Sequence, residues 1–196
     1  MRPWLSGLLD SAVLFHLLRS HAYVGTMPRL AACLDARPDE RVIDVGCGTG
    51  LCAGLVPGDY VGIDTHVPYL RLARRHGRGR SAEVASMSGA ALGFRERAFD
   101  KAVLISIVHH LDDAAVDSLL QGLRRIVQGA VVVLDLAPDY GNRVERFLMR
   151  HDRGHHVRTV PTMRTLLTRH YRLAHEEIFH NAFHSVAQVM FRLLPP

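Results

Sequence analysis

Three glycines at alternate positions, Gly46, Gly48 and Gly50, follow a short apolar run over residues 41–45. Glycine lets the backbone turn tightly and lets a ligand approach main-chain amide groups closely. In open α/β sheets, ligands bind beyond the carboxyl ends of the strands. The segment VIDVGCGTG over residues 42–50 therefore predicts a strand that ends in a ligand-binding loop, with the carboxylate of Asp44 beside it.

The spacing of these glycines limits the choice of ligand. The nicotinamide and flavin fingerprint is G-x-G-x-x-G, and counted from Gly46 its third glycine falls on Leu51. Counting from Gly48 leaves only a loose match at Ala53. A phosphate-binding P-loop needs a Gly-Lys-Ser/Thr sequence, but the single lysine, Lys101, is far away. The pattern D-x-G-x-G-x-G is instead typical of S-adenosylmethionine sites, where the loop meets the zwitterionic amino-acid end of the ligand.

A second carboxylate, Asp64, ends the next apolar run of the chain. A carboxylate at the end of this strand can accept hydrogen bonds from both ribose hydroxyls of a nucleoside ligand. The alternative is an N-cap for the helix that follows. Because Asp64 comes after an intact glycine loop, we expect the ribose role.

Histidines supply candidates for proton transfer, since a neutral imidazole can act as a base near pH 7. His109 and His110 follow a predicted strand, and the alternative is that they shape the pocket and cap the next helix. His155 belongs to a polar cluster, HDRGHHVR over residues 151–158, whose arginines could hold an acidic acceptor. The alternative for this cluster is a solvated turn. It lacks cysteine or glutamate ligands at familiar spacings, so no metal site is predicted.

Strands and helices must position these groups, and the apolar pattern predicts them. After residue 38 strands alternate with helices, which implies a parallel sheet with right-handed crossovers. The predicted strands cover residues 41–45, 60–63, 81–85, 101–108 and 130–136, and the predicted helices cover residues 68–76 and 113–127. The last of these strands, AVVVLDL, is nearly all apolar, as expected of a strand buried on both faces.

The two ends of the chain differ from this core. Apolar residues at helical spacing predict a helix near the N-terminus, which Gly25–Pro28 separate from a short helix that ends near Leu34. The C-terminal region is predicted to hold helices over 142–150 and 163–170, a polar stretch over 153–162, and an antiparallel strand pair over 175–179 and 185–193. We predict one domain with a helical cap (1–37), a cofactor-binding core (38–137) and an acceptor-side region (138–196).

Composition bounds the class of protein. A chain of 196 residues with 48% hydrophobic and 22% charged residues is typical of a globular domain. The net charge is +5, but its arginines are scattered singly or in pairs, so a nucleic-acid partner is not expected. Cys33, Cys47 and Cys52 form no CxxC pair, which favours a reducing cytoplasm. No signal peptide or transmembrane segment is predicted.

Taken in order, these motifs resemble those of class I S-adenosylmethionine-dependent methyltransferases of the small-molecule kind (methyltransferase type 11/12-like). The resemblance is clear over residues 38–137. VIDVGCGTG resembles the first motif, YVGID over 60–64 the acidic second motif, and SIVHHL over 106–111 the end of the fourth strand. It implies a Rossmann-like, mostly parallel seven-stranded sheet with helices on both faces, an antiparallel C-terminal edge strand and an N-terminal helical lid.

The resemblance also implies the cofactor, S-adenosylmethionine, and the residues that hold it. The implied cofactor-binding residues are Asp44, Gly46, Cys47, Gly48, Gly50, Asp64, Thr65, Ser88, Gly89 and Ser106. The family usually places an aspartate after the third strand, where it contacts the adenine amino group. This chain has Ser88 there, whose hydroxyl can hydrogen-bond adenine without the charge.

Three functions fit these observations to different degrees. The first is methyl transfer to a small-molecule acceptor by in-line displacement. The second is a binding or regulatory protein that keeps the fold without transferring methyl groups. The third, an oxidoreductase, is disfavoured by the glycine spacing. The Asn/Asp-Pro-Pro-Tyr motif of many amino-base methylases is absent where Ser106–His109 stand, so nucleic-acid bases are not the expected acceptors. The N-terminal helices could form a homodimer, lie on a membrane or cover the active site.

Overall fold

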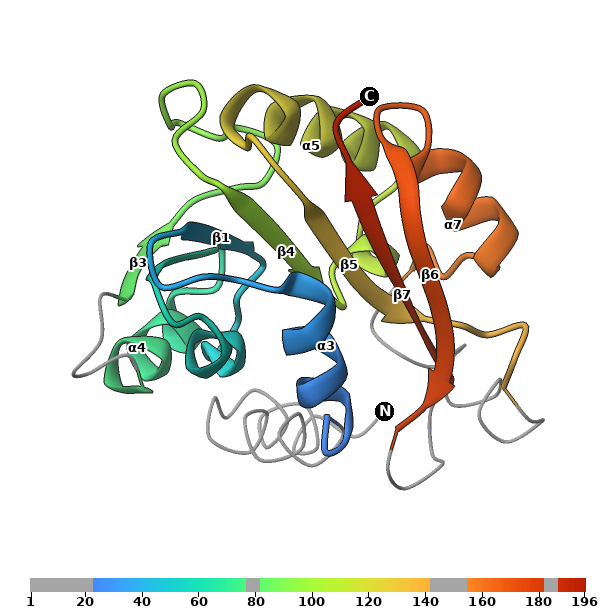
Figure 1. Cartoon of the computed structure of the whole chain (residues 1–196), viewed down its shortest axis with the longest axis horizontal. Coiled ribbons are helices and arrows are strands. Elements are labelled where there is room, and N and C mark those ends of the chain that lie inside the picture. The colour runs from blue at the N-terminus through green and yellow to red at the C-terminus, as the bar shows by residue number, and fades with distance from the viewer. Residues whose placement is uncertain (1–22, 77–81, 142–154, 182–186) are drawn as a thin grey trace, which may run out of the picture.

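The computed structural model describes residues 23–76, 82–141, 155–181 and 187–196, which build one seven-stranded sheet with helices on both faces (Figure 1). The strand order is β3-β2-β1-β4-β5-β7-β6. The strands are β1 (Arg41–Val45), β2 (Asp59–Asp64), β3 (Ala82–Ser86), β4 (Lys101–Ile105), β5 (Val131–Leu136), β6 (Arg172–His180) and β7 (Ala187–Leu194). The neighbours from β3 to β5 pair in parallel, whereas β7 is antiparallel to both β5 and β6.

This order confirms the predicted Rossmann-like sheet with a C-terminal antiparallel pair. The antiparallel strand itself, β7, is the inner member of that pair, and β6 forms the edge. The chain reverses its direction of winding between β1 and β4, and ligands of such sheets bind at this switch point.

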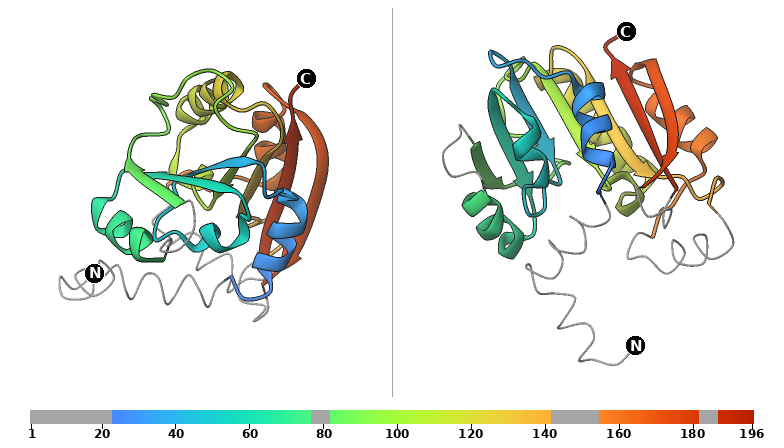
Figure 2. Two further views of the ribbon diagram at one scale, coloured as in Figure 1. Left: turned by 60° about the vertical axis from the view of Figure 1, so that its left-hand side comes forward. Right: turned by 60° about the horizontal axis from the view of Figure 1, so that its bottom comes forward.

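The helices cover the two faces of the sheet in separate layers (Figure 2). Helices α5 (Asp113–Ile126) and α7 (Val160–Leu167) pack on one face, against alternate strand residues such as Ile43 and Val133. Helix α3 (Thr26–Leu34), the 3-10 helix η1 (Leu51–Leu55) and helix α4 (Val67–His76) pack on the other, against residues such as Val42 and Val132. Burial on both faces accounts for the continuous apolar runs in the sequence.

Three predicted boundaries are wrong for local reasons. Strand β4 ends at Ile105 because Ser106 adopts a left-handed conformation (φ 50°), and the 3-10 helix η2 (Val108–His110) follows. Helix α7 begins inside the predicted polar stretch, where Thr159 caps it and Pro161 follows at its start, a favourable place for proline. Helix α3 begins at Thr26, so Pro28 lies in its first turn instead of before it.

Several predictions fall on residues outside the described ranges. These are the N-terminal helix before Tyr23 with its lid role, the helix over 142–150, and the first four residues of the polar cluster over 151–158. Within the described part of the chain, no helix has the length and apolar character needed to cross a membrane.

Candidate functional site

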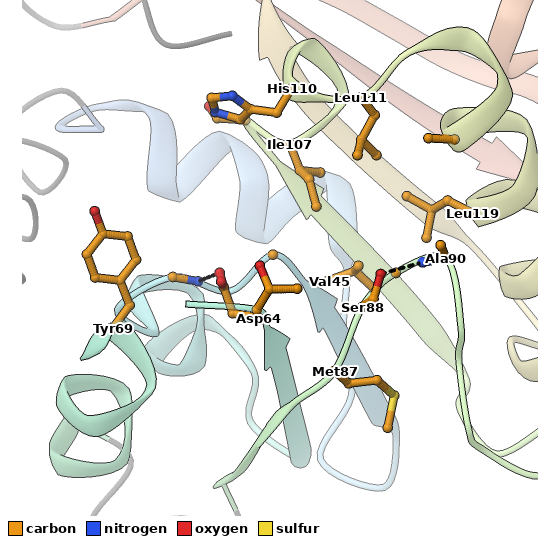
Figure 3. Close-up of a pocket in the computed structure, with 16 residues that line it drawn as sticks. Val45, Asp64, Tyr69, Met87, Ser88, Ala90, Ile107, His110, Leu111 and Leu119 are labelled. Carbon is orange, nitrogen blue, oxygen red and sulfur yellow. Dashed lines mark hydrogen bonds between the residues drawn. The ribbon is translucent and has the colours of Figure 1, made fainter. Parts of the chain in front are cut away.

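A cavity of about 460 Å³ opens at the carboxyl ends of β1, β2 and β4 (Figure 3). This volume lies within the range of about 300–1,000 Å³ that is usual for small-molecule sites. Asp64 and Tyr69 lie on one side of the cavity, and Ile107, His110 and Leu111 lie on the opposite side. Seven of the predicted cofactor-binding residues line it: Gly46, Gly48, Asp64, Thr65, Ser88, Gly89 and Ser106.

The glycine loop has the backbone that its sequence predicts. Gly46, Gly48 and Gly50 have φ values of 75°, 54° and 77°, a left-handed region that residues with a Cβ rarely adopt. A Cβ at Gly46 would also lie 2.6 Å from the Cδ1 atom of Ile107, so the Ile107 side chain would have to shift to admit it. The loop amides of Gly46 and Cys47 donate to the carbonyl of Ile63 at 2.8 and 3.0 Å, so β2 holds the loop in place.

Asp64 joins the loop to the end of β2. Its Oδ2 accepts a hydrogen bond from the Gly48 amide at 2.8 Å, and its Oδ1 accepts one from the His66 amide at 2.8 Å. The side chain therefore closes a turn just before α4 and also lines the cavity, where its role toward ribose stays a prediction. A carboxylate has about four lone-pair sites, so it can hold these amides and still accept from ligand hydroxyls.

The apolar part of the cavity lining suits a flat ring. Met87, Leu111 and Leu119 form it together with small residues. Ser88 lies here as predicted from its position, but its Oγ accepts a hydrogen bond from the Ala90 amide at 3.2 Å. The hydroxyl hydrogen of Ser88 can still donate to a ring nitrogen, since a hydroxyl is both donor and acceptor.

Asp44, in β1, and Cys47, within the glycine loop, line a second, very small cavity. Asp44 is buried, and the Tyr60 hydroxyl donates to its Oδ2 at 2.7 Å. Burial raises the pKa of the Tyr60 hydroxyl well above its ordinary value, and the charge of Asp44 raises it further. Tyr23 also lines this second cavity and forms a hydrogen bond with Ser106. This hydrogen bond links Tyr23, just before α3, to Ser106 in the wall of the larger cavity.

The three candidate bases occupy different surroundings. His110 is exposed and lines the cavity. His109 is 3% exposed, and its Nδ1 lies 2.5 Å from the Oδ1 atom of the buried Asp135. His155 is exposed and does not belong to the cavity wall. Of the three, the structure therefore brings only His110 to the cavity.

Some contributors to the site carried no recognisable signal in the sequence. Tyr69, Met87 and Leu119 reach the cavity only because their elements converge there, and nothing in their local sequence distinguishes them from core residues. Across the described residues there is no cluster of three or more histidine, cysteine or acidic side chains that could hold a metal ion.

The three cysteines are all buried, and burial raises the pKa of each thiol. Because the thiolate is the reactive form, each thiol stays protonated and unreactive at pH 8. We expect the native protein to react with Ellman's reagent far more slowly than the urea-unfolded protein, which should titrate all three thiols. Rapid reaction of even one thiol in the native protein would contradict this placement.

Comparisons with known proteins agree with this geometry. Residues 42–130 match the family model described as a methyltransferase domain. A tRNA (carboxymethyluridine(34)-5-O)-methyltransferase of Arabidopsis thaliana is 35% identical over 86 residues, which are 43% of this chain and 20% of that protein. The chain thus matches about a fifth of the length of its curated relatives.

Solved structures share the fold over most of the chain. A methyltransferase in complex with the Trm112 methyltransferase activator of Haloferax volcanii has a TM-score of 0.78 at 13% identity and covers 96% of both chains. An S-adenosylmethionine-dependent methyltransferase of Mesorhizobium loti has a TM-score of 0.67 at 20% identity, covering 85% of this chain and 96% of the other. Residues 42–130 match a methyltransferase domain, and the sheet order and the glycine loop agree with that match, so together they support identifying the chain as a class I S-adenosylmethionine-dependent methyltransferase.

Proposed function

We propose that this chain transfers a methyl group from S-adenosylmethionine to a small-molecule acceptor that enters the cavity beside His110. The observation that carries the proposal is the cavity that Asp64 and the left-handed glycine loop share at the switch point of the sheet. When bound, the cofactor supplies an electrophilic methyl group on a sulfonium. The protein then has to hold, orient and shield the reactants.

The cavity residues fit the three parts of that cofactor. The Asp64 carboxylate suits the ribose hydroxyls, and the glycine loop, with Gly46 and Gly48, suits the amino-acid end. The apolar wall with Met87 and Leu119 suits adenine, with Ser88 as its hydrogen-bonding group. We assign Asp44 and Cys47 to shaping the loop, because both line the smaller cavity.

His110 is the residue that we propose to meet the acceptor. Its imidazole is exposed on the cavity wall, opposite Asp64, where it can accept a proton from a hydroxyl or amine. His109 and His155 are not proposed as bases, since neither belongs to the lining of the cavity.

The charges that line the cavity bear on the identity of the acceptor. Among the described residues that line the cavity, Asp64 is the only charged side chain apart from the titratable His110, and this described set holds no arginine or lysine. Nucleic-acid backbones are held mainly by cationic side chains, so this composition favours a small molecule. The sequence relatives named as tRNA methyltransferases favour tRNA as a second candidate acceptor.

Calorimetry of the purified full chain tests the cofactor. We expect S-adenosylmethionine and S-adenosylhomocysteine to bind with micromolar dissociation constants, and NAD and NADP to give no heat of binding. Binding of the dinucleotides, or no binding of either sulfur nucleoside by a folded sample, would contradict the proposal. Tritiated S-adenosylmethionine then separates the acceptors: label in a low-molecular-weight extract supports a small molecule, and label in bulk tRNA supports the second candidate.

A further inference from the structure

The short segment Val108–Leu111 carries two cavity residues, His110 and Leu111, yet it contains only one 3-10 turn. A single turn of this kind has few internal hydrogen bonds and poor geometry, so it does not hold its own shape. Two charged side chains from distant parts of the chain surround it. They are Asp135 on β5 and Arg158, which lies just before α7.

Asp135 binds the amide side of the segment. Its Oδ2 accepts hydrogen bonds from the amides of Val108 at 2.9 Å and His109 at 3.3 Å. Its Oδ1 lies 2.5 Å from the His109 Nδ1 and accepts from the Leu136 amide at 2.7 Å. The carboxylate is 1% exposed, so all four of its partners come from inside the fold.

Arg158 binds the carbonyl side of the same segment. Its Nη1 donates to the carbonyl of Val108 at 3.0 Å, and its Nη2 donates to the carbonyl of Leu111 at 2.7 Å. The guanidinium also binds the Asp113 carboxylate through Nε at 2.8 Å and Nη2 at 2.6 Å. Although Arg158 belongs to a polar cluster in the sequence, it is only 8% exposed in the structure.

We infer that Asp135 and Arg158 are positioning residues, which hold Val108–Leu111 through its amides and its carbonyls respectively and so fix His110 and Leu111 on the cavity wall. The charges fit this role, since the anionic Asp135 accepts from backbone amides and the cationic Arg158 donates to backbone carbonyls. Within the pair of histidines, the buried His109 is part of this clamp, and its ring centroid lies 4.1 Å from that of His110. The role in binding rests on the proposed function, but the clamp itself can be tested separately.

Asp135→Asn is the sharpest test because an asparagine side chain cannot accept all the hydrogen bonds that the Asp135 carboxylate accepts. Asparagine offers one acceptor oxygen, and its amino group must then face amide or imidazole donors that the carboxylate now accepts. We expect Asp135→Asn to weaken S-adenosylhomocysteine binding at least tenfold by calorimetry. We also expect the loss of a far-downfield His109 ring N–H proton resonance, assigned by its absence in His109→Gln.

Two matched controls separate the clamp from general damage. Asp139 also accepts hydrogen bonds from a backbone amide, that of Val160 at 3.1 and 3.3 Å, but it does not line the cavity, so Asp139→Asn should change binding less than twofold. Arg164, in α7, donates to the Glu176 carboxylate through two guanidinium nitrogens, as Arg158 does to Asp113. Arg164→Lys is therefore the matched control for Arg158→Lys. We expect Arg158→Lys to weaken binding at least fivefold and Arg164→Lys to leave it unchanged.

The possible outcomes are distinct. Folded Asp135→Asn that binds S-adenosylhomocysteine within twofold of the wild type overturns the inference. If Asp135→Asn does not fold, Arg158→Lys decides, and unchanged binding by a folded Arg158→Lys overturns it. If the wild type binds no S-adenosylhomocysteine, the proposed function fails, while the His109 resonance and its loss in Asp135→Asn still report on the clamp. Absence of that resonance from the wild type contradicts the clamp.

Discussion

Asp64→Ala is expected to weaken S-adenosylhomocysteine binding by about 100-fold. Hydrogen bonds to a charged group contribute about 1.5 kcal/mol or more each, so two ribose hydroxyls on one carboxylate correspond to about 3 kcal/mol, or roughly 100-fold in affinity. The substitution also removes the acceptor of the Gly48 amide, which loosens the glycine loop. Both effects act in the same direction, and calorimetry measures their sum.

A second substitution and a control on the same strand make this result specific. Asp64→Asn keeps an oxygen that can accept from the Gly48 amide but removes the charge, so it should bind more tightly than Asp64→Ala and less tightly than the wild type. Asp59 is an exposed aspartate at the opposite end of β2, so Asp59→Ala should leave the affinity unchanged. An affinity of Asp64→Ala within threefold of the wild type would refute the ribose role.

The conformation of the glycine loop and its contact with Asp64 were predictable because they depend on short-range rules. A strand followed by glycines at fixed spacing specifies a left-handed loop, and Gly46, Gly48 and Gly50 all adopt that conformation. Parallel strands place their carboxyl ends at one edge, which is why Asp64 meets the loop that precedes it in sequence.

Short-range sequence rules do not distinguish the two neighbouring histidines, His109 and His110. His109 and His110 are chemically identical neighbours, and either is an equally good candidate base when only their positions in the sequence are considered. Their difference arises from Asp135, a residue of the buried β5, whose pairing with His109 depends on the tertiary structure. The role of Arg158 was hidden for the same reason. In the sequence it belongs to a polar cluster, and in the structure its donors face the carbonyls of Val108 and Leu111.

Lys101→Met is expected to destabilise the fold by about 3 kcal/mol at pH 7, which is typical when one partner of a buried ion pair is removed. Lys101, at the start of β4, is paired with Glu40 at 2.8 Å, and the two side chains are 10% and 8% exposed. Its ammonium also donates to the carbonyl of Asp35, which ends helix α3. The substitution leaves the buried Glu40 carboxylate with a hydrogen bond from the Arg37 amide at 2.8 Å, and its remaining cationic contact is the exposed Arg37 guanidinium at 3.3 Å.

The pH dependence gives this prediction a second, independent measurement. Burial acts to raise the pKa of Glu40, but its hydrogen bonds to Lys101 and to the Arg37 amide, with the charges of both residues, lower the pKa overall. A lowered folded-state pKa stabilises the fold above the ordinary glutamate value of about 4.3, and this stabilisation is lost as the pH falls through the folded pKa. Without Lys101, burial dominates and the pKa of Glu40 should rise instead. The stability difference between wild type and Lys101→Met should therefore shrink from pH 7 to pH 4.

Urea unfolding at pH 7 and pH 4 tests whether Lys101 and Glu40 behave as a buried ion pair or as a solvated one. The four proteins compared are the wild type, Lys101→Met, Lys101→Met combined with Glu40→Gln, and Arg37→Met. Lys101→Met combined with Glu40→Gln should recover more than half of the lost stability, because no uncompensated charge remains buried. Arg37→Met removes the exposed partner of the same carboxylate and should cost less than about 1 kcal/mol. A loss below 1 kcal/mol for Lys101→Met, or a loss that is equal at both pH values, would mean that Glu40 is solvated well enough to need no cation. The turn between α3 and β1 would then depend on its apolar contacts, with Leu34 and Val42 packed in the same core.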